Sequence, residues 1–132
     1  MTHNVIWQGT DQPFLIDWEA IKKWNPTREA IRTCVAWSGV GNEPFSSSLL
    51  EKTLKTYINF GGPLEKNYVE ASLNGMYGSM INWMLYNIDL VISSHSDARK
   101  NTAINEINNS LVFGAKLTRL YPLLYNSIIG VF

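Results

Sequence analysis

The chain has 132 residues, enough for one domain with a buried core, and its 45% hydrophobic content is typical of a globular protein rather than a disordered one. Its formal net charge is zero and its lysines and arginines are scattered, which argues against nucleic-acid binding and against attachment to an anionic membrane. The single cysteine, Cys34, excludes an internal disulfide and fits a reducing compartment, so we expect a small buried apolar side chain there.

Two short apolar runs open the chain, separated by a Gln-Gly-Thr-Asp-Gln-Pro turn. This pattern predicts a β-hairpin over residues 4–17, with Asn4 at the entry of the first strand and Asp17 at the exit of the second. A tight hairpin brings these two positions together. The residues before the hairpin do not form a signal peptide, which predicts a cytoplasmic protein.

Asn4 and Asp17 have an ordinary interpretation and a functional one. Asparagine and aspartate commonly cap turns and helices, so each residue alone predicts only a cap. Together, an amide and a carboxylate at the two ends of one hairpin are the hard oxygen ligands that Mg²⁺ prefers. The second interpretation depends on the residues around them.

Those residues resemble the C-terminal lobe of the aminoglycoside phosphotransferase and choline kinase superfamily, whose members are built like protein kinases. In that family a His-x-Asp catalytic loop leads to a metal-binding Asn, then a short apolar strand, a turn and an Ile-Asp-Trp element. The matching segments are Asn4-Val5-Ile6-Trp7 and Leu15-Ile16-Asp17-Trp18-Glu19. Less specific similarity continues through Asn25-Pro26-Thr27-Arg28-Glu29 and the Asn-Trp-x-x-Tyr-Asn pattern within residues 80–88, and so covers nearly the whole chain.

The resemblance implies ATP and Mg²⁺ as cofactors, because phosphoryl transfer depends on cations that neutralise the transferred group. It places Asn4 and Asp17 on the metal ions, and Ile6 and Ile16 under the adenine. It also implies a small-molecule acceptor, with Trp18, Glu19, Glu70 and Trp83 as candidate substrate residues. The alternative for the tryptophans is a core position, and for Glu70 a solvated helix face.

The resemblance covers only the second half of the family's catalytic loop. Counting five residues back from Asn4 places the family's catalytic Asp before Met1, and the chain has no match to the nucleotide lobe. We therefore expect the C-terminal part of a phosphotransferase acting on a small-molecule hydroxyl, inactive by itself. Two alternatives stay open: a non-catalytic binding or dimerisation module, which exposes the surface that the missing lobe would cover, and an unrelated helical domain with a coincidental hairpin.

Beyond the hairpin the pattern is helical, which predicts an α+β fold, mostly α, with about four helices over residues 25–130 in one domain spanning residues 1–132. The predicted helices begin at the Asn25-Pro26 cap, at Ser46 to Ser48, near Lys66 or Asn67, and near Ala98. Their predicted ends are near Gly39, Phe60, Ser93 and Tyr125, and Pro122 is expected to kink or weaken the last one. The segment 38–44 is expected to form a loop.

The most hydrophobic stretch, residues 76–92, is interrupted by Asn82, Asn87 and Asp89, so we expect a buried core helix rather than a membrane span. Gly75 and Gly78 within the third helix predict close approach of a neighbouring helix. In the last helix, the apolar pattern predicted to continue the core is Ile104, Ile107, Leu111, Ala115, Thr118 and Leu120.

Overall fold

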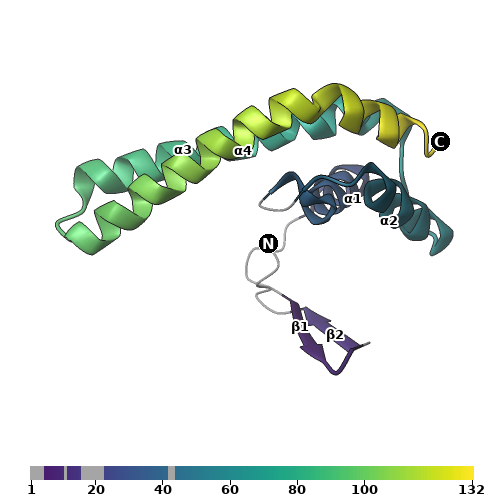
Figure 1. The fold of residues 1–132 in the computed structure, drawn as a ribbon, viewed down its shortest axis with the longest axis horizontal. Helices are drawn as coiled ribbons and strands as arrows, with labels where there is room; N and C mark the ends of the chain where they lie inside the picture. Colours follow the sequence, from purple (N-terminus) through teal and green to yellow (C-terminus); the bar gives the residue numbers. More distant parts are fainter. Residues whose placement is uncertain (1–4, 11, 16–22, 42–43) are drawn as a thin grey trace.

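The structure is a computed structural model that describes residues 5–10, 12–15, 23–41 and 44–132. Two short strands, β1 (Val5–Gln8) and β2 (Gln12–Leu15), pair antiparallel. Val5 lies opposite Leu15 and Gln8 opposite Gln12, and Gly9 takes a φ of 70° in the turn, a value that glycine adopts without strain. The rest of the described chain is mostly helical and contains four α-helices, as the sequence predicted (Figure 1).

Helix α1 (Pro26–Val35) begins as its sequence predicts. The side chain of Asn25 accepts a hydrogen bond from the Arg28 N–H at 3.2 Å, and Pro26 occupies the first turn, where no N–H is needed. The chain then continues into η3 (Ala36–Val40), a π-helical turn. The prediction of a loop from residue 38 was therefore wrong for its first residues, although Gly39, with a φ of 97°, does interrupt the regular helix.

The next two helices also keep the predicted bounds to within a few residues. Helix α2 (Ser47–Asn59) is capped by the Ser46 hydroxyl, which accepts from the Leu49 N–H at 3.2 Å. A short 3₁₀ turn, η4 (Lys66–Tyr68), leads into α3 (Val69–Ser93). The Ser46 cap thus located the start of α2, whereas α3 begins without a side-chain cap.

Helix α4 (Asp97–Ile129) is longer than predicted. It begins one residue earlier than expected, with Ser96 as its cap, and continues past Pro122 to Ile129. Proline lacks an N–H and removes one hydrogen bond from a helix interior, but it does not end a helix that is held by packing on both sides of it. Leu117, Leu124 and Ile128, which flank Pro122 in sequence, are fully buried and supply that packing.

The core lies at one end of the molecule. Helices α3 and α4 run antiparallel, and α1 and α2 pack against the N-terminal part of α3 and the C-terminal part of α4 (Figure 1). Cys34 is buried there, as expected, and burial raises the pKa of its thiol. The buried hydrophobic cluster contains Ile31, Cys34, Val35, Val40, Leu50, Leu54, Val69, Leu73, Met76, Leu117, Leu124 and Ile128.

The other halves of α3 and α4 extend beyond this core as a two-helix arm, here defined as residues 79–93 of α3 and 97–113 of α4 (Figure 1). The prediction of a buried core helix over residues 76–92 was wrong for most of this stretch, because only Met76 and Asn87 in it are buried. No helix in the described part of the chain is both long enough and apolar enough to cross a membrane.

The arm also reverses the apolar pattern predicted for α4. Ile104 and Leu111 are 43% and 54% exposed, whereas Ala103 and Ser110, one residue before each, are buried. Ile104 and Leu111 are therefore turned toward solvent, whereas Thr118 of the same predicted pattern hydrogen-bonds to Tyr77 of α3 and Leu120 packs against the core. Within the arm, the buried residues of α4 are the small Ala103 and Ser110.

Close approach of the two long helices occurs at Gly114 rather than at the glycines singled out in the sequence. A Cβ atom at Gly114 would lie 2.7 Å from the Met80 sulfur, closer than real Cβ atoms come. A Cβ at Gly78 would meet nothing within 4 Å, so the prediction of close packing there was wrong. At Gly75 the nearest atoms belong to the Arg28 side chain, at 3.4 Å, which is ordinary van der Waals contact.

Gly39 provides a test of the π-helical turn. Alanine at this position would have to adopt a φ of 97°, and its Cβ would collide with the Pro44 carbonyl oxygen, so we expect Gly39→Ala to lower the free energy of unfolding by about 2–4 kcal/mol. Urea unfolding followed by circular dichroism measures this. Gly41→Ala is the matched control, because Gly41 has a negative φ and open space around it, and it should change stability by less than about 1 kcal/mol. Equal losses in the two variants would contradict this account of the turn.

Candidate functional site

Most of the residues predicted to hold metal and nucleotide lie outside the described part of the chain. This applies to Asn4, Ile16 and Asp17, and to the substrate candidates Trp18 and Glu19. Ile6 belongs to β1, where its backbone lies opposite Phe14. Among the residues that the structure describes, no group of three or more His, Cys, Asp or Glu side chains could hold a metal ion.

The register of the hairpin concerns the residues next to the predicted metal ligands Asn4 and Asp17. Val5 and Leu15 lie opposite each other at the open end of the hairpin. Asn4 precedes Val5 directly in the sequence, and Asp17 follows Leu15 by two residues. The described strands thus end opposite each other, within two residues of the predicted metal ligands in the sequence.

The two remaining substrate candidates, Glu70 and Trp83, both lie on α3, and the structure does not bring them together. Thirteen residues of α-helix separate them, which corresponds to about 20 Å along the helix axis. Glu70 is exposed beside the core end of the molecule, whereas Trp83 is on the arm. A single small acceptor does not reach both.

Glu70 borders a group of polar and aromatic side chains between α3 and α4. The Tyr121 hydroxyl donates a hydrogen bond of 3.4 Å to the side-chain oxygen of Asn74, one helical turn after Glu70. The rings of Tyr77 and Tyr121 are 6.5 Å apart at an interplanar angle of 32°, and the Tyr77 hydroxyl bonds to Thr118 at 3.2 Å. We call Glu70, Asn74, Tyr77, Tyr121 and Tyr125 the tyrosine cluster.

The electrostatics of the tyrosine cluster disfavour negative charge on Tyr121. Partial burial raises the pKa of the Tyr121 phenol, and the Glu70 carboxylate, Tyr77 and Tyr125 raise it further. A carboxylate beside aromatic rings attracts cations rather than anions. Of this group, only Glu70 was predicted from the sequence as a site residue. The tyrosines carried a weak signal, since Tyr121 and Tyr125 are four residues apart on one helix.

Trp83 has partners within the arm. Its indole N–H donates to the Glu106 carboxylate at 3.1 Å, and its ring stacks on Tyr86 with centroids 5.4 Å apart and planes at 25°. Asn87 donates to the Trp83 carbonyl at 2.8 Å. The hydrogen bond to Glu106 joins α3 to α4, so the described contacts give Trp83 a structural role in the arm.

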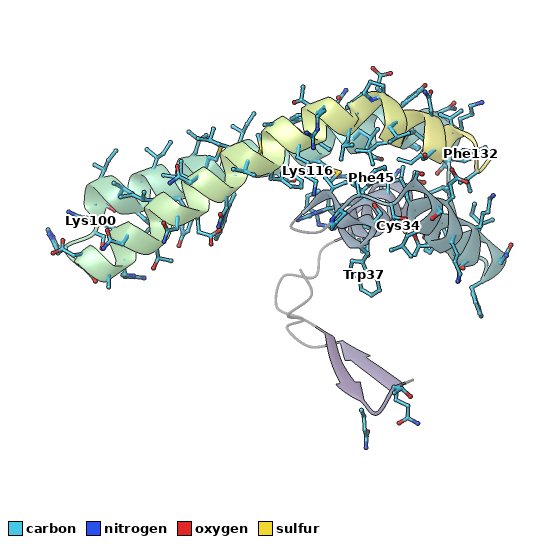
Figure 2. The ribbon with its side chains drawn as sticks, in the orientation of Figure 1. Cys34, Trp37, Phe45, Lys100, Lys116 and Phe132 are labelled. Carbon is cyan, nitrogen blue, oxygen red and sulfur yellow. The ribbon has the colours of Figure 1, made fainter. Side chains whose placement is uncertain are left out.

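Two glycines close together, Gly39 and Gly41, give this segment a superficial likeness to a phosphate-binding loop. Their carbonyl oxygens accept hydrogen bonds from Lys116. The Lys116 ammonium donates to the Gly39 carbonyl at 2.5 Å and to the Gly41 carbonyl at 3.1 Å. Figure 2 shows Lys116 on α4 where that helix passes over the α1 region. A phosphate loop presents N–H groups to its ligand, whereas here the carbonyls fix the η3 turn to α4.

Comparison with known proteins assigns no family. No protein-family model matches the chain, and neither a curated protein nor a solved structure matches it.

The tyrosine cluster predicts an altered alkaline titration. The Tyr121 pKa lies above that of an ordinary tyrosine, and Glu70→Gln should lower it, because the substitution removes a negative charge that disfavours the phenolate. ¹³C NMR of the tyrosine Cζ resonances against pH measures the change, with Tyr121→Phe to assign the signal. Glu51→Gln, on α2, is the control and should leave the Tyr121 pKa unchanged. A Tyr121 pKa that does not respond to Glu70→Gln would show that the carboxylate is too well solvated to act on the phenol.

Proposed function

We propose that this chain is the C-terminal part of a cytoplasmic, ATP-dependent phosphotransferase that acts on a small-molecule hydroxyl of the aminoglycoside type. The observation that supports the proposal is the β1–β2 register, in which Val5 and Leu15 end the hairpin opposite each other, one residue after Asn4 and two residues before Asp17 in the sequence. An amide and a carboxylate in that setting suit Mg²⁺ and a nucleotide tail.

Each group has a defined role in this proposal. Asp17 and Asn4 would hold Mg²⁺, whose positive charge would stabilise the negative charge of the phosphates. Ile6 and Ile16 form an apolar floor under the adenine. Trp18 and Glu19 follow the metal ligand directly in the sequence and are the proposed acceptor contacts.

The helical part contributes less to this site than the sequence suggested. Because Glu70 and Trp83 are far apart and Trp83 is bonded within the arm, the proposal retains Glu70 as an acceptor contact and gives Trp83 no role in acceptor binding. Glu70 and the tyrosine rings offer a surface for a cationic, polyamine-like acceptor.

A catalytic base is needed to orient the acceptor hydroxyl, and the sequence from Met1 contains no match to the family's His-x-Asp element. The proposal therefore holds that the 132-residue chain transfers no phosphate by itself and needs a further segment that carries the base and the nucleotide lobe.

A second candidate function is a non-catalytic binding or dimerisation module. The observation that favours it is the arm, where large apolar side chains are exposed: Ile81, Leu85, Ile88, Ile92, Ile104 and Leu111 are between 40% and 78% accessible. Exposed apolar surface of this extent usually marks an interaction site. The two functions are compatible, since they use different parts of the chain.

The metal half-site is tested by isothermal titration calorimetry of Mg²⁺–ATP into the purified chain. We expect measurable binding that Asp17→Asn weakens at least tenfold, because the amide removes the negative charge that attracts the metal. Asp89→Asn, an exposed aspartate on α3, is the matched control and should bind like the original chain. Binding that is equal in all three proteins would place any nucleotide contact elsewhere, and absence of binding by the original chain would remove the support for the half-site.

A further inference from the structure

The arm has an unusual distribution of side chains. The buried residues of the arm are the small or polar Asn87, Ala103 and Ser110, and buried Gly114 directly follows the arm on α4. Many of the large aliphatic residues of the arm are exposed instead. The arm therefore leaves uncovered the surface that normally forms the interior of a helical bundle.

On α3 this surface is a regular stripe. Ile81, Leu85, Ile88 and Ile92 follow one another at spacings of four, three and four residues, which places them on one side of the helix. They are 49%, 57%, 40% and 78% exposed. This is the seam spacing of helices that pack against other helices over two or more turns.

The stripe on α4 lies on the same side of the arm. Ile104 and Leu111 are seven residues apart, and each directly follows a buried residue that faces α3. On α3, Ile81 and Ile88 likewise directly follow Met80, which touches Gly114, and buried Asn87. A step of one residue turns the side chain by about 100° around the helix axis. Because the two helices are antiparallel, this step leads to the same side of the pair on α3 and on α4, so both stripes lie on one side of the arm.

We infer that this side of the arm binds a second copy of the chain, with the two arms antiparallel about a two-fold axis. We call the surface the arm face; it comprises Ile81, Leu85, Ile88, Ile92, Ile104 and Leu111. The inference rests on the second candidate function and deepens it by naming the partner and its orientation; it does not depend on the proposed phosphotransferase.

The first reason for choosing a second copy is the symmetry of the stripe. Spacings of four, three and four read the same in both directions, so a reversed copy presents an identical pattern. Leu85 then lies opposite Ile88 of the second copy, and Ile81 opposite its Ile92. A two-fold interface requires such self-complementarity.

The second reason is charge. Asp97 and Lys100 lie on the arm-face side of α4 near the tip, and exposed Arg119 lies beyond the other end of the arm, at the edge of that side. An antiparallel copy brings the carboxylate of each chain toward the guanidinium of the other, while the six residues of the arm face carry no charge. The net charge of zero removes long-range repulsion between copies.

The third reason is area. The exposed fractions of the six side chains correspond to roughly 600 Å² per chain, or about 1,200 Å² for two chains, at the lower end of the range for specific interfaces. Neighbouring side chains of the two helices add to this value. The arm face is thus large enough for a dimer but has a composition that is costly to leave in water.

Sedimentation equilibrium of the purified chain tests the inference. We expect a dimer of the 15.0 kDa chain at micromolar concentration and a dissociation constant raised at least tenfold by Leu85→Glu, which places a carboxylate near the two-fold axis. Leu49→Glu is the matched control, since Leu49 is an exposed leucine in the first turn of α2, where a carboxylate is tolerated. It should leave the dissociation constant unchanged.

Ile92→Glu provides a second variant, because its side chain is 78% exposed and its replacement does not disturb the helix pair. Circular dichroism of each variant checks that the helices remain. A monomer at 100 µM of the original chain, or a dimer that persists in both arm variants, would overturn the inference. ATP binding is measured separately, so loss of the dimer and loss of the half-site are distinguishable.

The antiparallel orientation is tested by charge exchange. Arg119→Asp sets two carboxylates against each other at each end of the arm pair and should weaken the dimer several-fold at low salt. The double variant Asp97→Arg with Arg119→Asp should recover the original dissociation constant. A double variant no tighter than Arg119→Asp would exclude the antiparallel arrangement.

Discussion

The close contact between α3 and α4 determines most of this structure. It depends on small residues, above all Gly114, where the Met80 side chain takes the space of a Cβ atom. Ala103 and Ser110 continue the same side of α4 toward the tip of the arm. Side chains this small allow two long helices to lie side by side, but they bury little apolar area between them.

The consequence is an uneven distribution of stability along the molecule. At the core end, α1 and α2 cover the two long helices, and fully buried residues such as Leu54, Leu73 and Leu124 supply the hydrophobic stabilisation. At the arm end, hydrogen bonds such as that of Trp83 to Glu106 link the helices, while the aliphatic side chains face outward. We expect the arm to open more readily than the core when it has no partner.

The proposed half-site and the arm face lie in different parts of the chain and have different physical bases. The half-site is an argument from residue chemistry at one end of a hairpin, where Asn4 and Asp17 flank the paired strands. The arm face is an argument from burial, spacing and charge along α3 and α4. The two proposals are compatible, because a chain that contributes a half-site through its hairpin can also dimerise through its arm.

The starts of α1, α2 and α4 follow from the sequence alone, because capping is local. Asn25, Ser46 and Ser96 each satisfy free N–H groups within one turn of their own position, and no distant contact is needed for that. The end of α4 was predicted less well, since burial of Leu124 and Ile128 outweighs the local effect of Pro122.

Only the tertiary structure decided which side of each long helix is buried. Apolar periodicity shows that Ile104 and Leu111 share a side of α4, but it does not show whether that side meets the same chain, another chain or water. Gly114 and Ser110, which face α3, have no hydrophobic signal to read. The same holds for the candidate site. Residue types in the sequence suggested Asn4, Asp17 and Glu70. The distance between Glu70 and Trp83 followed only from the structure, because an unbroken α3 fixes their separation along its axis.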